Sequence, residues 1–337
     1  MHVTDFSHYD GLGLAELVKT KQVSAKELLE DVQELSNRLN PDLNAIIRTR
    51  FERAFDEASE IKGLEKPFIG VPILLKDLSQ AIAGEKITAG TRMLKDRQAL
   101  MDSHFVAKIR EAGFLIAGQT SSPEFGLKNV TEPSLYGPAR NPWNLAHSPG
   151  GSSGGASAVV AAGIVPIAGA SDGGGSIRIP ASFTGLVGLK PTRGRTPVGP
   201  GVGRQWHGAA GDFVLTKTVR DSAAMLDALQ VIQPEAAFNV PLFEGSYLTD
   251  AIHHQRKFRI AYSVQSPVGT PVSADAAQAV HKMVKWLEEQ GHYIEEKVPE
   301  IDGIRLMENY YIMNCGEMAS DIQSIEESIG RKVTSED

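Results

Sequence analysis

A serine that follows three consecutive glycines is the strongest chemical signal in this sequence. Residues 150–175 hold nine of the 33 glycines, and seven of these nine form two clusters. Clustered glycine indicates a backbone that approaches something closely, because glycine otherwise carries an entropic cost. Side-chain-free residues leave their N–H groups open, so the second cluster fits an oxyanion site beside a nucleophilic Ser176. The glycines of this site are Gly173, Gly174 and Gly175.

Two other interpretations of the glycine clusters fit less well. A flexible linker would gain nothing from the apolar segment 156–162, which lies between the clusters. A phosphate cradle would need the Gly-Lys-Ser/Thr ending of a P-loop or the G-x-G-x-x-G of a dinucleotide site, and the sequence has neither. We therefore expect no cofactor.

A nucleophilic serine needs a base, and two residue types are candidates. None of the nine histidines is tied to Ser176 by its spacing; His147 is the nearest along the chain. A lysine can take the same role where burial lowers its pKa. Lys76 directly follows the apolar run 68–75 and so leaves a core strand. Lysines at strand ends more often reach solvent, so the residues alone leave the base open.

Four motifs make the chain resemble the amidase signature family. They stand in the family's order and spacing, and the resemblance extends from about residue 10 to the end of the sequence. The motifs are 70–77 (GVPILLKD), 148–155 (SPGGSSGG), 171–180 (SDGGGSIRIP) and 185–191 (GLVGLKP).

The resemblance implies a Ser–cis-Ser–Lys triad made of Ser176, Ser152 and Lys76. In the family the bridging serine follows a cis peptide bond, which here is Gly151–Ser152. Ser176 would attack an amide carbonyl, Ser152 would relay its proton to neutral Lys76, and the glycine N–H groups would receive the oxyanion. The implied activity is an amidohydrolase that cleaves the C–N bond of a small-molecule amide, linear or cyclic.

Residues around this triad are expected to support it. Asp172 and Arg178 flank the nucleophile and should pair, and Ser153 should hydrogen-bond in the same network. Trp143 is expected to serve in packing, and Cys315 to be a buried hydrophobic residue.

The segments 177–180 (IRIP) and 190–195 (KPTRGR) favour one branch of the family. They resemble aryl, peptide and oligoamide hydrolases, near the 6-aminohexanoate cyclic-dimer hydrolases. Two alternatives remain: the glutaminase (A) subunit of a tRNA-dependent amidotransferase, which needs a partner subunit, and a truncated, catalytically silent member.

Composition excludes several other classes of protein. The formal net charge is −7, without a basic excess, so we expect neither nucleic acid nor an anionic membrane as a partner. A single cysteine excludes a disulfide framework and a multi-thiolate metal site, and we expect no metal. Residues 1–13 lack a long apolar stretch and do not resemble a secretory signal. We expect a cytoplasmic protein.

The elements that must position these residues alternate between helix and buried strand. This alternation predicts an α/β sheet covered by helices on both faces, and the resemblance implies the amidase signature fold with a mixed central sheet. The predicted elements are a helix from the capping box 24–27 to 40–41, strands over 68–75 and 114–117, a helix ending at 113, and a C-terminal βαβ unit with strands over 258–263 and 292–296.

We predict a single amidase domain over residues 1–337. It would comprise an N-terminal helical segment (1–60), a catalytic core (61–232) and a peripheral βαβ and helical part (233–337). Typical family members are considerably longer, so the C-terminal third of the family domain is expected to be absent. Uncovered sheet edges would then favour association into a homo-oligomer.

Overall fold

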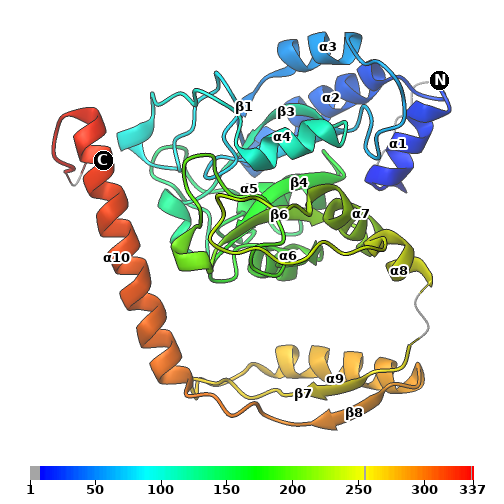
Figure 1. The fold of residues 1–337 in the computed structure, drawn as a ribbon, viewed down its shortest axis with the longest axis vertical. Helices are drawn as coiled ribbons and strands as arrows, with labels where there is room; N and C mark the ends of the chain where they lie inside the picture. Colours follow the sequence, from blue (N-terminus) through cyan, green and yellow to red (C-terminus); the bar gives the residue numbers. More distant parts are fainter. Residues whose placement is uncertain (1–7, 254–255, 335) are drawn as a thin grey trace. The chain divides into compact units, whose positions relative to one another are not determined.

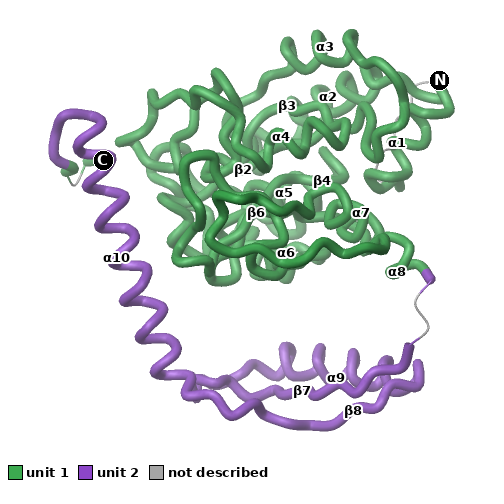
Figure 2. The backbone as a smooth tube through the Cα atoms, in the orientation of Figure 1, with its two compact units in different colours: residues 1–252, 333–337 green, residues 253–332 purple. Residues whose placement is uncertain are grey.

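The chain divides into two compact units (Figure 2). The computed structural model describes residues 8–253, 256–334 and 336–337. Unit 1 contains the chain up to Ile252 together with the last residues from Val333, and unit 2 runs from His253 to Lys332. Residues 1–7 lie outside the described residues. They belong to the predicted N-terminal helical segment and to the stretch 1–13 that does not resemble a secretory signal. The predicted single domain, divided at residues 60 and 232, stays a prediction.

A six-stranded sheet forms the centre of unit 1 (Figure 1). Its strands are β1 (Ile46–Thr49), β2 (Pro72–Lys76), β3 (Leu115–Thr120), β4 (Ile167–Asp172), β5 (Val187–Gly188) and β6 (Gly211–Thr216). The spatial order is β1-β3-β2-β4-β6-β5. β2 is parallel to both of its neighbours, while the pairs β1–β3, β4–β6 and β5–β6 are antiparallel. The predicted α/β fold with a mixed central sheet is confirmed.

Helices cover both faces of this sheet. Every residue of β2, β3 and β4 is buried, which requires cover on both sides. The helices of unit 1 are α1 (Gly11–Lys19), α2 (Ala25–Leu43), α3 (Phe51–Ser59), α4 (His104–Glu111), α5 (Gly154–Ala161), α6 (Arg178–Thr184), α7 (Val219–Leu229) and α8 (Tyr247–His253), with short 3-10 turns η2 (Arg92–Leu94), η3 (Glu124–Gly126) and η4 (Trp206–Gly208). α2 packs against β2, α7 against β6, and α5 against β2, β4 and β6. None of the helices in the described part of the chain is long and apolar enough to cross a membrane.

Several predicted elements have different boundaries in the structure. β3 continues three residues beyond the predicted end at 117, and α4 ends at Glu111 instead of at 113. The apolar run 68–75 is a strand only from Pro72, because the chain turns before it: Gly70 has a φ of +73°, and the Val71 N–H donates to the Phe68 carbonyl. α2 begins with the predicted capping box but continues to Leu43. Pro41 stands in the last turn of that helix, where its missing N–H costs a single hydrogen bond.

The start of α5 is pressed against the end of β3, and this contact requires glycine. A Cβ on Gly155 would lie 2.5 Å from the Ser121 nitrogen and 2.7 Å from the Ala45 carbonyl oxygen. A side chain at this position would therefore push the helix away from the sheet. The apolar segment after the first glycine cluster forms this buried helix, and Ser152 and Ser153 directly precede its first residue, Gly154.

Unit 2 contains the predicted βαβ arrangement. The strands β7 (Arg259–Tyr262) and β8 (Tyr293–Glu296) pair in parallel and are joined by α9 (Ala274–Glu289). The long helix α10 (Gly303–Ile329) follows, and its buried residues are Gly303 and Ile325. Cys315 lies on this helix and is exposed, so the expectation of a buried cysteine is wrong.

Candidate active site

Two parallel, neighbouring strands end at the same edge of the sheet. β2 ends with Lys76 and β4 ends with Asp172, and the strands pair through Leu74 and Ala168. The carboxyl ends of parallel strands form one edge, and ligands of open α/β sheets bind outside that edge. The glycine run that follows β4 therefore places Ser176 on the side of the sheet at which Lys76 ends.

The Lys76 side chain is fully buried, with 0 % of its surface exposed. Its Nζ lies 2.7 Å from the Ser152 Oγ and 3.0 Å from the Ser171 Oγ. Two hydroxyls can accept hydrogen bonds from an ammonium group, and one can also donate to a neutral amine. Lys76 therefore does not reach solvent, as lysines at strand ends more often do.

Burial lowers the pKa of Lys76 from 10.5 to about 7, against the attraction of Asp212 and Asp172. Removing an ammonium group from water disfavours its charged form, and neither carboxylate offsets the whole effect. Near neutral pH this amine can therefore be present in its neutral form. A base with a pKa near the working pH suits proton transfer.

This shift makes the stability of the chain depend on pH. The unfolded chain keeps the lysine proton up to its ordinary pKa of 10.5, while the folded chain loses it near 7. The unfolded state thus binds more protons between these values, and the free energy of unfolding should rise with pH by up to about 1.4 kcal/mol per pH unit. We expect Lys76→Met to remove this slope. Urea unfolding of both proteins from pH 7 to 10 tests it, and parallel profiles would contradict the assignment.

Ser152 stands in a tight turn between Gly150 and α5. The Gly151–Ser152 peptide is cis, as the family resemblance implied. The Thr131 hydroxyl donates to the Gly150 carbonyl at 2.9 Å and accepts from the Gly154 N–H at 3.1 Å, so one side chain holds the turn on both sides of the serine pair. Ser152 is buried. These contacts aim its hydroxyl at the lysine amine.

Asp172 organises the loop that carries Ser176. Its carboxylate accepts the Gly175 N–H at 2.8 Å and the Ile177 N–H at 3.1 Å, and both its oxygens lie 2.9 Å from Arg178 nitrogens. Burial alone would raise the pKa of Asp172, but the hydrogen bonds from Arg178 and the loop N–H groups outweigh burial and lower it. The expected pairing of Asp172 with Arg178 is present.

Ser176 is half-buried at the end of the glycine run. Its carbonyl accepts the Ser153 N–H at 3.3 Å, which ties the two serine loops together. The N–H of Gly175 is already donated to Asp172, whereas no described residue accepts a hydrogen bond from the N–H groups of Gly173 and Gly174. A Cβ on Gly173 would lie 2.6 Å from the Trp206 ring, so an indole covers this end of the loop.

Three residues of this edge were not expected from the sequence: Ser171, Asp212 and Gln80. Ser171, inside a quoted motif but without an assigned role, contacts the Lys76 amine. Ser153, the expected supporting residue, donates to the Ser171 carbonyl at 3.2 Å and accepts its N–H at 3.3 Å. Asp212 and Gln80 also lie behind the lysine. In the sequence, Asp212 is marked only by being a single carboxylate directly before the apolar residues 213–215, which belong to the same strand, β6.

Two residues considered in the sequence lie in exposed positions. Trp143 has 75 % of its surface exposed, and its indole N–H donates to the Thr184 carbonyl at 2.8 Å. Most of the Trp143 ring is therefore not packed against other residues, contrary to the expectation, and the indole N–H holds it at the surface. His147 is also exposed, in a turn whose backbone closes onto Asn141 and Asn144.

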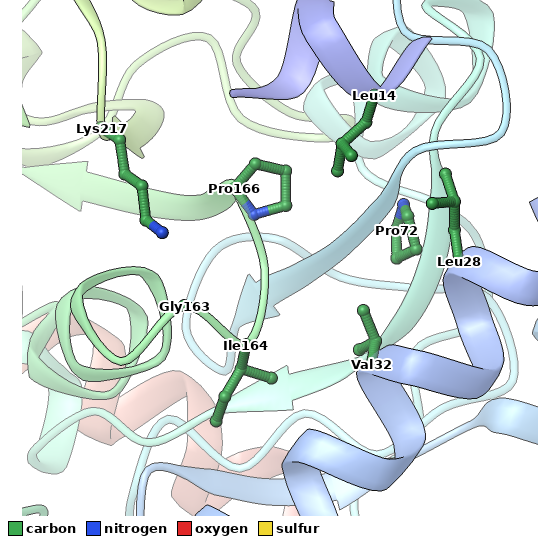
Figure 3. A pocket seen from close by; sticks show the side chains of 8 residues that line it. All are labelled: Leu14, Leu28, Val32, Pro72, Gly163, Ile164, Pro166 and Lys217. Atoms are coloured by element: carbon green, nitrogen blue, oxygen red, sulfur yellow. The ribbon is translucent and has the colours of Figure 1, made fainter. Parts of the chain in front are cut away.

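A small cavity lies at the opposite edge of the sheet, near the first residues of β2 and β4 (Figure 3). Its volume is about 10 Å³, and Leu14, Val32, Pro72, Ile164 and Lys217 line it. A cavity of this size holds about one water molecule and no substrate. Within residues 8–253, 256–334 and 336–337, no cluster of acidic, histidine or cysteine side chains could hold a metal ion.

The fold places a buried lysine against the hydroxyls of Ser152 and Ser171 at one edge of a mixed α/β sheet. A family model described as Amidase matches residues 27–336. The chain is 44% identical over 312 residues to a lipoamidase of Enterococcus faecalis, covering 93% of this chain and 41% of that protein. It is 38% identical over 334 residues to a 6-aminohexanoate-cyclic-dimer hydrolase of Pseudomonas sp. (strain NK87), covering 97% and 67%.

A solved structure of 6-aminohexanoate cyclic dimer hydrolase complexed with substrate superimposes with a TM-score of 0.92 at 36% identity, over 98% of this chain and 69% of that one. The chain belongs to the amidase signature family. It spans less than half of the lipoamidase and about two-thirds of the cyclic-dimer hydrolase.

Proposed function

We propose that this chain is an amidohydrolase that cleaves a carboxamide C–N bond through an acyl-enzyme on Ser176. The observation that carries the proposal is the buried pair of Lys76 and Ser152, whose Nζ and Oγ are 2.7 Å apart. A buried amine with a pKa of about 7 can accept a serine proton at neutral pH, which an ordinary lysine cannot. No histidine is needed for this chemistry.

The proposed acylation moves one proton along two hydroxyls. The Ser176 Oγ attacks the amide carbon while its proton passes to the Ser152 Oγ, and the Ser152 proton passes to the neutral Lys76 amine. The proton then returns along the same relay to the leaving nitrogen, and the C–N bond breaks. A water molecule, deprotonated by the same relay, attacks the ester and releases the carboxylic acid.

The proposed oxyanion site is the backbone of the glycine run. The N–H groups of Gly173, Gly174 and Ser176 would receive the negative charge of the tetrahedral intermediate. Gly175 was also predicted from the sequence to belong to the oxyanion site. Its N–H, however, is donated to Asp172, so we propose that it holds the loop in place instead of binding the oxyanion.

Substrates are proposed from the relatives and from the family branch. One relative is named a lipoamidase and another a cyclic-dimer hydrolase, so we propose small non-peptide amides, linear or cyclic. Incubation with linear amides, cyclic amides and glutamine, followed by detection of the released amine or ammonia, tests this. Turnover of glutamine only with a partner subunit would favour the alternative that the chain is the glutaminase subunit of an amidotransferase. The absence of turnover with every amide would favour the alternative of a truncated, catalytically silent member.

The relay role of Ser152 predicts an intermediate loss of activity. Ser152→Ala should slow acylation by roughly 10²–10³-fold, within the range of a lost proton-transfer group, because water can replace the hydroxyl imperfectly. The measurement is the rate of amine release under saturating substrate. Ser157→Ala is a matched control, since Ser157 is equally buried on the same segment but donates to the Pro149 and Gly154 carbonyls. Equal losses in both variants would remove Ser152 from the relay.

The expected partners stay predictions. These are a small-molecule amide, no nucleic acid and no membrane, with association into a homo-oligomer and a cytoplasmic location. Sedimentation velocity of the full chain would decide the oligomeric state.

A further inference from the structure

Asp212 is a buried carboxylate that the proposed mechanism does not use. It lies on β6 directly opposite Ser171 of β4, with 2 % of its surface exposed. One carboxylate oxygen accepts from the Ser79 hydroxyl at 2.6 Å and from the Gln80 amide at 3.2 Å, and the other accepts from the Gln205 amide at 3.1 Å.

Each of these contacts is a hydrogen bond that an ionised carboxylate can accept. The orientation of the Gln80 amide is set by its other bonds, because its oxygen accepts the Lys76 N–H at 2.9 Å and its nitrogen donates to the Ala170 carbonyl at 2.9 Å. The nitrogen, which can only donate, therefore faces the carboxylate. Burial raises the pKa of Asp212, and the donated hydrogen bonds from Ser79, Gln205 and Gln80 oppose that rise.

The positive charge that faces Asp212 is that of Lys76. Within the described residues no ion pair joins the two side chains directly, so Gln80 connects the carboxylate to the lysine backbone. The negative charges that act on the Lys76 amine are Asp212, from β6, and Asp172, from the end of β4. Asp172 is already paired with Arg178.

The remaining carboxylate near the lysine is Asp77, which follows it on the chain. Asp77 forms an ion pair with Arg48 at 2.6 Å and accepts the Thr88 N–H at 3.0 Å. Asp212 is thus the facing carboxylate whose side-chain hydrogen bonds come from neutral donors, namely Ser79, Gln80 and Gln205.

We propose that Asp212 is a positioning residue that balances the positive charge formed on Lys76 when this amine takes the nucleophile's proton. The inference rests on the proposed function, in which Lys76 cycles between a neutral and a charged form. A fixed negative charge behind the amine stabilises the charged form, and hydrogen bonds from neutral groups keep that charge in place.

The Asp212 carboxylate also holds the segment whose indole, that of Trp206, packs against the glycine loop. Gln205, which donates to Asp212, directly precedes Trp206, and the Trp206 ring lies against Gly173. Asp212 thereby links Ser79 and Gln80, which follow Lys76 on the chain, to Gln205, which precedes the indole beside Gly173.

The test compares Lys76 ionisation in the wild type and in Asp212→Asn. Full-length protein labelled at lysine 13Cε is titrated by NMR, with the Lys76 signal assigned by its loss in Lys76→Met. Removal of the negative charge should lower the Lys76 midpoint by at least half a pH unit. The acylation rate at its high-pH plateau should fall at least tenfold, because a weaker base drives the transfer less.

Asp221→Asn is the matched control. Asp221 is an equally buried carboxylate, and it accepts the N–H groups of Gly11 and Leu12 at the start of α1, away from the lysine. This variant should lose stability without moving the Lys76 midpoint. If the Asp212→Asn variant fails to fold, Ser79→Ala is the second variant. It removes a hydrogen bond that lowers the pKa of Asp212, so Asp212 carries less negative charge near neutral pH and the Lys76 midpoint should fall by a smaller amount.

The outcomes separate this inference from the proposed function. A wild-type midpoint near 10.5 would overturn the base assignment itself. A wild-type midpoint near 7 that neither Asp212→Asn nor Ser79→Ala moves would overturn only the role of Asp212. An equal shift in Asp221→Asn would show a general effect of lost stability and would also overturn it.

Discussion

Replacing Ser176 by alanine is expected to abolish acylation, with a loss of roughly 10⁴-fold or more in amide hydrolysis. The Oγ of this residue is the atom that forms the covalent bond, so no neighbouring group can substitute for it. The loop does not depend on this half-buried side chain, because Asp172 holds the loop through Gly175 and Ile177. The variant should therefore fold normally, and stopped assays of amine release measure the loss.

Ser182→Ala is the control for Ser176→Ala. Ser182 is an exposed serine on α6, six residues beyond the proposed nucleophile. Its replacement should leave the rate unchanged. Retention of more than a tenth of the wild-type rate by Ser176→Ala would transfer the role of nucleophile to another residue.

Replacing Lys76 by alanine should remove most of the activity at neutral pH, with a loss of roughly 10³–10⁴-fold as for a missing general base. Raising the pH should restore part of it, because hydroxide can take the serine proton. In the wild type the rate should rise with pH along one ionisation with a midpoint near 7, since only the neutral amine accepts a proton. At pH 6 about a tenth of the lysine is neutral, and at pH 8 about nine-tenths.

His147→Ala tests the competing base. His147 is exposed in a turn, and its replacement should leave both the rate and the pH profile unchanged. A Lys76→Ala protein that keeps full activity at neutral pH, or a histidine variant that loses as much as Lys76→Ala, would refute the lysine mechanism.

Local pattern was sufficient to predict much of the fold. The capping box at Ser24 and Glu27 starts a helix, and the strands at the C-terminal βαβ unit lie within one residue of the predicted ranges. The apolar run before Lys76 was predicted too long, because Gly70 turns the chain before the strand begins. Periodicity cannot detect such a turn when every flanking residue is apolar.

Some contacts of the candidate site join residues that are adjacent in sequence, and others join residues that are far apart along the chain. Ser176 and its glycines are adjacent in sequence, so their chemistry could be inferred from composition. The contacts of Lys76 with Ser152 and Ser171 span 76 and 95 residues and depend on the order β2–β4 in the sheet. Asp212 enters only because β6 pairs with β4, and nothing in a single sequence specifies that pairing.

Exposure was the least predictable property. Cys315 was expected in the core but lies on an exposed face of α10, and Trp143 is held at the surface by one hydrogen bond. Both residue types are often buried, and the sequence contains no local feature that distinguishes an exposed one.

The most direct test of the central claim is to trap the acyl-enzyme and locate it. Full-length protein is mixed with an amide substrate or a fluorophosphonate, quenched in acid and digested with trypsin, and the adduct is located by fragment ions. The tryptic peptide 141–178 contains both Ser152 and Ser176, so the fragments must separate the two hydroxyls. We predict an adduct on Ser176 that forms faster at pH 8 than at pH 6. An adduct on Ser152 or on any residue other than Ser176, or a pH-independent rate, would contradict the account.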